Sequence, residues 1–318
     1  MTVKHSKALT SVGIIGLMLT IMEAMTAQPW AFMISHQNFH STEDVVEYAT
    51  ATATPQMRRW IGGRDAKRIF AQTIELKVEK YEATLRDTVQ NWMYDLTGML
   101  NRRLENFVAR SIRHWDKLAT EVIELGGSTL TYDGANFFSA SHSLGDSGTI
   151  KNLVTASEIA TLNVASTSAV TTAEAADIIF DLLTHFQTFK DDQGEPIHED
   201  LNRMMIMIPP QMGRAFIQAV KANVITDSNG SRDNPLANAG LEIVVKVNVR
   251  LTSSTVLYAF ALNGDPALIL QQRGDVRMTS KAEGSDFEHD HDEWEFGMSA
   301  ERVAGLFCWQ AAIKATIS

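Results

Sequence analysis

Cysteine is nearly absent from this sequence: Cys308 is the only one among 318 residues, so no disulfide bond can form within the chain. The cysteine content therefore gives no support for secretion into an oxidising compartment. Cys308 stands in the apolar run Ala304-Gly-Leu-Phe-Cys-Trp309. We expect it to be a small buried side chain and not a reactive thiol.

Basic residues are fewer than acidic ones. The 28 Lys and Arg residues against 38 Asp and Glu residues give a formal net charge of −10. A surface that binds nucleic acid uses an excess of Lys and Arg to neutralise phosphates. The composition therefore argues against sequence-specific nucleic-acid binding.

Motifs for phosphate binding and catalysis are missing as well. The glycine pairs at 62–63 and 126–127 stand in neither a GxxxxGK(S/T) nor a GxGxxG context. Asp133 and His142, with three serines nearby, supply the residue types of a nucleophilic site, but no GxSxG motif surrounds these serines. Residue types without a defined geometry are weak evidence for catalysis. We therefore predict that the chain is not an enzyme and binds no cofactor.

One acidic segment has the residue types of a metal site. In Asp286-Phe-Glu-His-Asp-His-Asp-Glu293, two histidines, His289 and His291, stand two apart among carboxylates. In a strand these histidines would share a face and both could reach one divalent ion. The spacing is not that of the HExxH zinc motif, so the favoured interpretation is an acidic hairpin or loop before a strand at 294–298. No metal is predicted, and the two histidines stay weak candidates.

The N-terminus has some features of a secretory signal peptide, since two lysines precede the apolar stretch 8–22. Glu23 interrupts that stretch, and bulky Met25 lies two positions before the candidate cleavage residue Ala27. The stretch is also short for a membrane span. The favoured interpretation is an apolar arm that packs on a neighbouring subunit, with an exported or anchored protein as the alternative.

Alternation of apolar residues begins at Ile69 and changes phase near Glu79-Lys80. This pattern predicts a long strand or a hairpin with an irregularity at that point. An isolated two-stranded ribbon is marginal in water, so it needs a surface to lie on, and a neighbouring chain is one candidate.

The clearest periodic segment follows the alternating one. Apolar residues from Trp92 to Ile123 recur at helical spacing, and Gly126-Gly127 supply the end of the helix. A helix of about 35 residues would be about 50 Å long, which exceeds the diameter of a small domain. The pattern therefore predicts a long spine helix.

The rest of the chain mixes helices and strands irregularly. Thr171 to Glu174 has the pattern of a capping box that opens an amphipathic helix. Further on we expect strands at 204–208, 241–249, 255–262 and 267–271, and a helix at 211–224. Such irregular alternation predicts an α+β architecture and not a doubly wound parallel sheet.

Several unrelated short motifs occur in the order found in one family. They are Thr54-Pro-Gln-Met-Arg-Arg-Trp-Ile-Gly-Gly-Arg64, Glu79-Lys-Tyr-Glu82, Tyr132-Asp-Gly-Ala-Asn-Phe-Phe138 with Ser141-His142 and Asn152, Gly194-Glu-Pro196, Pro209-Pro210, Asn234-Pro235, and the tail from Phe296-Gly297 to Gln310. From about residue 50 to its end, the chain resembles the Mu-like phage major head subunit family, gpT. It departs from the family in having Glu79 where Asn is expected and in an unusually apolar segment 1–49.

The resemblance implies the Hong Kong 97-like fold of tailed-phage capsids. Its expected parts are an N-terminal arm at 1–55, an E-loop at 56–90, a P-domain at 91–150 and 266–300 with a spine helix at about 91–125, and an A-domain at 151–265 and 301–318. The expected final strand is 301–318.

The resemblance also implies a function: a major capsid protein that assembles through pentamers and hexamers into the icosahedral head enclosing phage DNA. Its expected place is the virion, after assembly in the host bacterial cytoplasm. The expected partners are further copies of itself and possible scaffold, decoration or portal proteins, with no membrane. The residues predicted to act in assembly are Met57, Trp60, Ile74, Leu76, Val78 and Tyr81.

Two other functions remain open at the level of sequence. One is an encapsulin-like compartment with the same fold, and the other is an exported metal-binding protein or hydrolase. Some relatives with this fold crosslink a Lys to an Asn between subunits, for which Lys77 or Lys80 would be placed here. We do not predict a crosslink, because that reaction needs a positioned carboxylate and exclusion of water.

Overall fold

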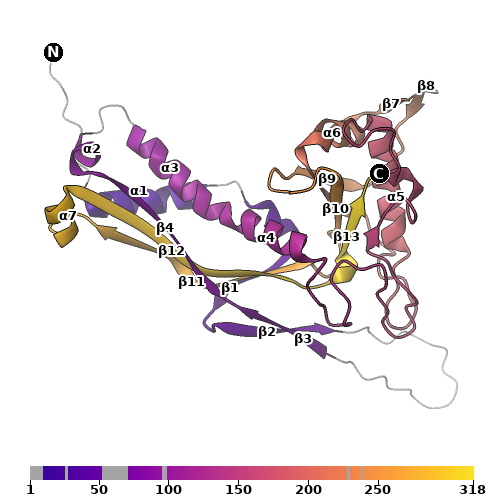
Figure 1. The fold of residues 1–318 in the computed structure, drawn as a ribbon, viewed down its shortest axis with the longest axis horizontal. Helices are drawn as coiled ribbons and strands as arrows, with labels where there is room; N and C mark the ends of the chain where they lie inside the picture. Colours follow the sequence, from indigo (N-terminus) through magenta and orange to yellow (C-terminus); the bar gives the residue numbers. More distant parts are fainter. Residues whose placement is uncertain (1–9, 26–27, 52–70, 95–98, 228–229, 238) are drawn as a thin grey trace.

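Two parts of different shape make up the computed structural model, which describes residues 10–25, 28–51, 71–94, 99–227, 230–237 and 239–318. Figure 1 shows a long sheet with helices above it and, at one end, a compact domain that holds the C-terminus. Met57 and Trp60 lie outside the described residues. The mixture of helices with largely antiparallel strands confirms the predicted α+β class.

The long sheet has four strands in the order β1-β11-β12-β4. The strands are β1 (Ser35–Ser41), β11 (Leu268–Lys281), β12 (Glu293–Leu306) and β4 (Glu79–Thr88). β1 pairs parallel with β11, and the other pairings are antiparallel. Since β11 and β12 have 14 residues each, the hairpin they form is about 45 Å long. A short helix, α7 (Asp286–His291), lies between these two strands.

A long helical segment lies along this sheet (Figure 1). It comprises α2 (Val89–Met93), α3 (Met99–Ile112) and α4 (His114–Leu125). Around Arg113 the helical hydrogen bonds continue, from Arg113 N to Ala109 O at 3.0 Å and from Lys117 N to Arg113 O at 3.3 Å. α3 and α4 together therefore extend about 40 Å. The predicted spine helix is confirmed from Met99 to its end at Gly126, with a division at Arg113. Its predicted start at about residue 91 is wrong, because α2 ends at Met93 and Tyr94 is not helical.

The N-terminal apolar segment forms α1 (Ser11–Ala24). Ile14 and Met18 are fully buried in a second core between α3 and the distal part of the β11–β12 hairpin. Its buried face therefore packs on its own chain, which corrects the expectation of an arm on a neighbouring subunit. Val12 on its outer side is exposed. None of the helices in the described residues combines the length and apolar character that a membrane crossing requires.

The compact domain is a five-stranded mixed sheet covered by two helices, α5 (Thr172–Gln187) and α6 (Gly213–Lys221). The strands, in spatial order, are β5 (Leu153–Val154), β13 (Ala312–Thr316), β10 (Val256–Ala261), β6 (Arg203–Ile208) and β9 (Glu242–Val247). The predicted capping box is present, because Thr171 Oγ1 accepts from Glu174 N and the Glu174 carboxylate accepts from Thr171 N. A hairpin of β7 (Val224–Asp227) and β8 (Gly230–Asp233) extends from this domain.

Short 3-10 helices connect the larger elements. They are η1 (Trp30–Ile34), η2 (Ala160–Leu162), η3 (Pro210–Met212) and η4 (Trp309–Ala311). The last of them corrects the expected final strand 301–318. Residues 301–306 complete β12 in the long sheet, and the chain then crosses through η4 into the compact domain, where only Ala312–Thr316 form a strand.

A separate two-stranded ribbon, β2 (Val45–Ala51) with β3 (Ala71–Lys77), lies on the other side of the long sheet from α3 and α4 (Figure 1). After Val78 the chain leaves the ribbon and enters β4 of the long sheet. The expected change of phase near Glu79-Lys80 is therefore a change of partner strand. The expected hairpin inside 69–85 is wrong, because the partner of β3 comes from residues 45–51, which the sequence placed in the arm.

Candidate assembly site

The motif of residues 132–138 with Ser141-His142 and Asn152 surrounds a buried ion pair. Asp133 Oδ2 lies 2.5 Å from His142 Nδ1, and the two side chains are 1% and 0% exposed. Burial acts to raise the pKa of Asp133, but hydrogen bonds from Thr131 and His142 outweigh it and hold that pKa below its ordinary value. Asp133 is therefore a carboxylate at neutral pH.

The second nitrogen of His142 also faces hydrogen-bond acceptors. His142 Nε2 lies 3.1 Å from Asn152 Oδ1 and 3.3 Å from the Phe137 carbonyl oxygen. The Asn152 amide has a defined orientation, since its Nδ2 donates to the Phe137 carbonyl at 2.7 Å and its Oδ1 accepts from Ser139 N at 2.8 Å. Both ring nitrogens of His142 thus lie within hydrogen-bond distance of oxygen atoms, so the imidazole is fixed in position between Asp133 and Asn152.

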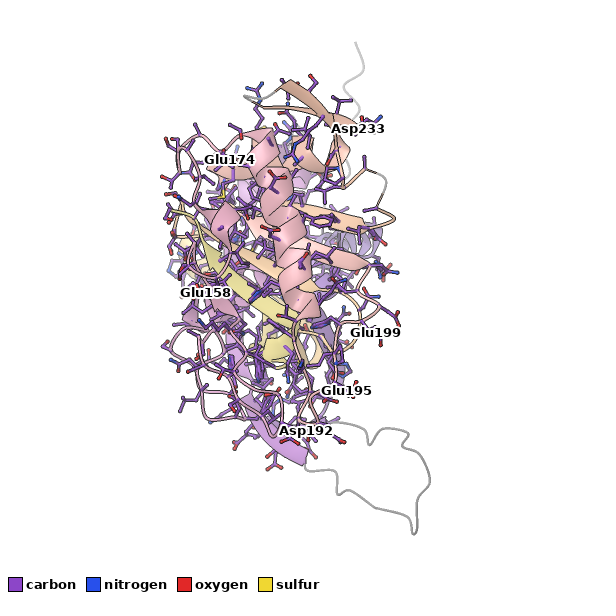
Figure 2. The ribbon with its side chains drawn as sticks, turned by 90° about the vertical axis from the view of Figure 1, so that its right-hand side faces the viewer. Glu158, Glu174, Asp192, Glu195, Glu199 and Asp233 are labelled. Carbon is purple, nitrogen blue, oxygen red and sulfur yellow. The ribbon has the colours of Figure 1, made fainter. Side chains whose placement is uncertain are left out.

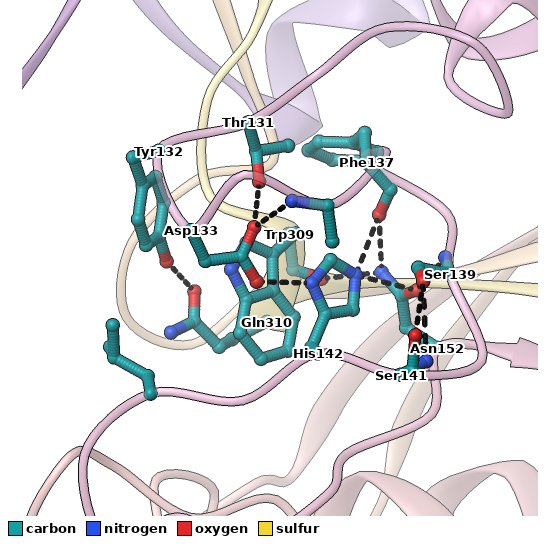
Figure 3. A network of polar contacts seen from close by, with 12 residues as sticks. Thr131, Tyr132, Asp133, Phe137, Ser139, Ser141, His142, Asn152, Trp309 and Gln310 are labelled. Atoms are coloured by element: carbon teal, nitrogen blue, oxygen red, sulfur yellow. Dashed lines mark hydrogen bonds and ion pairs between the residues drawn. The ribbon is translucent and has the colours of Figure 1, made fainter.

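The pair is covered by the C-terminal segment. The rings of His142 and Trp309 are stacked, with centroids 3.8 Å apart and planes at 3° (Figure 3). Asn152 Nδ2 also donates to the Trp309 carbonyl at 3.2 Å, and the hydroxyl of Tyr132 bonds to the side chain of Gln310. The network therefore fastens the loop after the long helix to the crossing between the two sheets.

This geometry does not form a nucleophilic site. The Ser139 and Ser141 hydroxyls contact each other at 3.4 Å, whereas both nitrogens of His142 are occupied by other groups. A catalytic triad needs a hydroxyl hydrogen-bonded to the imidazole. The Asp133–His142 pair therefore has a structural role.

The base of the ribbon is fastened to the long sheet by different contacts. Tyr48 Oη donates to Gln271 Oε1 at 3.0 Å and accepts from Asn38 Nδ2 at 2.9 Å. Leu76 is buried over Gly305, where a Cβ atom would lie 2.3 Å from the nearer Leu76 Cδ atom. Only glycine at this position of β12 lets the ribbon lie so close.

Comparison with known proteins places these features in a family. Residues 22–165, slightly under half of the chain, match the Mu-like prophage major head subunit gpT family. This segment is similar to the gpT family. The matched part contains α3, α4, both strands of the ribbon and the Asp133–His142 pair. The resemblance predicted from sequence is confirmed within residues 22–165, and the family matched is that of a phage major head subunit.

Solved structures with the same fold are capsids. The chain is similar to the bacteriophage JBD30 procapsid protein (TM-score 0.51, 16% identity, covering 96% of this chain and 75% of that chain). It is also similar to the mature capsid of bacteriophage PhiM1 (TM-score 0.55, 8% identity, covering 93% of this chain and 89% of that chain). A third similar structure is a virus-like particle from Pyrococcus furiosus (TM-score 0.50, 10% identity, covering 94% of this chain and 96% of that chain). At these identities the likeness shows the fold, so the predicted Hong Kong 97-like fold is confirmed. No curated protein matches the chain.

The residues that the sequence predicted to act in assembly have different surroundings in the structure. Leu76 is buried within the chain, and Ile74 and Val78 are half-buried. The Tyr81 ring packs edge-on against His114 of the same chain, with centroids 4.5 Å apart. Leu76 thus fastens the ribbon to β12, whereas Tyr81 joins β4 to α4 within the same subunit.

The candidate metal residues lie at the far end of the long sheet. The segment predicted as a hairpin or loop forms α7, so the strand alternation that would place His289 and His291 on one face does not apply. The His289 side chain is 90% exposed, and the His291 ring stacks on Phe287 at 4.5 Å. No cluster of three potential metal ligands occurs among the described residues.

The outer face of the compact domain carries several acidic side chains. Figure 2 labels carboxylates distributed over it, namely Glu158, Glu174, Asp192, Glu195, Glu199 and Asp233. Some serve local structure: hydrogen bonds from Thr155 and Ser157 lower the pKa of Glu158 to about 2. Burial raises the pKa of the lone thiol, Cys308, to about 12, as expected of an unreactive side chain.

Acid is expected to weaken the contact between α4 and β4. Burial, followed by the positive charges of Arg302 and Lys117, lowers the pKa of His114 from 6.5 to about 4. A depressed pKa in the folded state gives stability that is complete above 6.5 and is lost as pH falls towards 4. A His114→Gln variant should therefore show a smaller drop in melting temperature between about pH 7 and about pH 5 than the unaltered chain. Equal drops would contradict this assignment.

Proposed function

We propose that this chain builds the icosahedral head of a tailed bacteriophage by assembling into pentamers and hexamers around the phage DNA. The observation that carries this proposal is the gpT match over the segment that contains the ribbon and the long helix. The capsid fold of the whole chain supports it. No chemical step is required, so the function rests on contacts between copies.

In a closed shell, one surface of a subunit meets a different surface of the next, and such heterologous contacts close into rings. In the proposed assignment, the ribbon with residues 52–70 is the E-loop, α3 and α4 are the spine of the P-domain, and the compact domain is the A-domain. An isolated two-stranded ribbon is marginal in water. Only its base is fastened to its own long sheet, and we infer that the rest lies on the long helix of an adjacent subunit.

Of the residues predicted for assembly, Met57 and Trp60 are the ones proposed for this contact, since Ile74 lies on the ribbon face that is held towards its own long sheet. A double variant, Met57→Ala with Trp60→Ala, should fold with an unchanged melting temperature but raise the protein concentration needed for shells at least about tenfold, since aromatic anchors dominate interfaces. Sedimentation velocity of the untagged chain measures the amounts of unassembled subunits and of shells, and negative-stain microscopy shows the shells directly. Shell formation equal to that of the unaltered chain would exclude these two residues from the contact.

The fold alone does not separate a phage head from other shells, since the virus-like particle from Pyrococcus furiosus has it too. The gpT match favours the phage head over an encapsulin-like compartment. Particles purified from their natural source should contain DNA, measured by the ratio of absorbance at two ultraviolet wavelengths. A stoichiometric protein cargo without DNA would support the compartment instead.

A further inference from the structure

The ribbon presents two faces of different chemistry. On one face Val45, Glu47, Ala49, Thr73, Glu75 and Lys77 are exposed, whereas Val46, Tyr48, Ile74 and Leu76 on the other face are buried or half-buried. The second face is the one held at its base by Leu76 over Gly305 and by Tyr48 against Gln271. The odd-numbered face therefore points away from its own subunit.

Two carboxylates stand directly opposite each other on that exposed face. Glu47 of β2 is in register with Glu75 of β3, and both are exposed. Within the described part of the chain neither forms an ion pair, although Lys77 lies two residues from Glu75 on the same face. Like charges directly opposite in a sheet are destabilising. In an isolated subunit the two carboxylates therefore repel each other. Basic side chains of a partner would offset this repulsion by pairing with both carboxylates.

A basic surface lies on the long helix. Arg102 and Arg113 are separated by three helical turns and so lie on one side of it, about 16 Å apart, with Arg110 beside them. All three are exposed, and none forms an ion pair with another described residue. Two acidic residues are close in sequence: Glu105 is three residues from Arg102, and Asp116, which accepts from Ala31 N at 3.2 Å, is three residues from Arg113. The adjacent Arg103 is already paired with Asp87 at 2.8 Å.

The two surfaces are on opposite sides of the long sheet. Figure 1 shows α3 and α4 on one side and the ribbon on the other, so they cannot meet within one subunit. Resting on the proposed function, we infer that the carboxylates of Glu47 and Glu75 of one subunit pair with Arg102, Arg110 and Arg113 of the next. The occupant of the ribbon's exposed face is therefore a second copy of this chain, and the charges set the register between the copies.

Charge reversal tests this pairing. Glu47→Arg with Glu75→Arg, and separately Arg102→Glu with Arg110→Glu and Arg113→Glu, should each raise the protein concentration needed for shells at least about tenfold, because like charges then face each other. Combining all five changes should restore assembly. A control with the same change of charge outside the ribbon, Glu43→Arg with Glu82→Arg, should assemble normally.

A neutral variant separates the pairing from a loss of folding. Glu47→Gln with Glu75→Gln removes the repulsion, so the subunit should melt at the same or a slightly higher temperature while assembling less well. The pairing would be overturned if the charge-reversal variants assembled like the unaltered chain, or if the variant with all five substitutions failed to recover assembly. Either result would leave the proposed capsid function intact. Failure of the unaltered chain to form shells would overturn the proposed function itself.

Discussion

Replacing Asp133 by asparagine is expected to lower the free energy of unfolding by about 3–5 kcal/mol, because it breaks the buried Asp133–His142 pair by removing the carboxylate. Both side chains are almost completely inaccessible to solvent, and every other group around the imidazole is an acceptor already bonded elsewhere. Urea denaturation of unassembled subunits at neutral pH measures the loss. Since the network fastens the two sheets together, the yield of shells should fall with stability.

A nearby substitution supplies the control. Ser141→Ala removes an exposed hydroxyl within the same loop, next to the network but outside the ion pair, and surface changes of this kind stay within about 0.5 kcal/mol. A loss below about 1 kcal/mol for Asp133→Asn would contradict the structural role assigned to the Asp133–His142 pair.

A side chain at Gly305 is expected to displace the ribbon without unfolding the subunit. An alanine Cβ would lie 2.3 and 2.7 Å from the two Leu76 Cδ atoms and 3.1 Å from Leu76 Cγ, so Leu76 must move. Overpacking of this kind costs about 1–3 kcal/mol. Gly305→Ala should lower subunit stability by that amount and reduce shell formation much more, because the ribbon no longer points at its neighbour.

A double variant shows whether the clash with Leu76 is the cause. Adding Leu76→Ala to Gly305→Ala returns space to the contact, so the combined loss of stability should be smaller than the sum of the two single losses. Gly127→Ala is the matched control, because the nearest atom to its added Cβ is Lys314 Nζ at 3.9 Å. Strict additivity of the two changes would show that Leu76 and Gly305 do not press on each other.

Local signals in the sequence predicted local structure well. The capping box at Thr171 and the end of the spine helix at Gly126 depend on residues close in the chain, and both occur as predicted. The change of phase near Glu79 was also predicted, but the sequence did not indicate that the chain changes its partner strand there. The sequence contains no local signal that β3 would pair with residues 45–51, because strand pairing over such a separation is decided by the whole fold.

The buried network shows the same limit. Asp133, His142 and Asn152 belong to a motif that carries the family resemblance. From the composition of this segment alone, we expected these residues to lie in a polar loop. Their burial depends on Trp309, which is remote in sequence and stacks on His142 only after the chain has crossed between the two sheets. Likewise the acidic segment before Glu293 forms a short helix ended by Asp292 in a left-handed conformation (φ 53°), a conformation that aspartate tolerates better than most residues.

The most direct test of the account is cryo-electron microscopy of the untagged chain assembled at moderate protein concentration. We predict closed icosahedral shells in which rings of five and six subunits share one contact, with the ribbon of each subunit lying over α3 and α4 of the next. A chain that stays monomeric or dimeric across all protein and salt concentrations, or a shell in which the ribbon folds back on its own subunit, would contradict it.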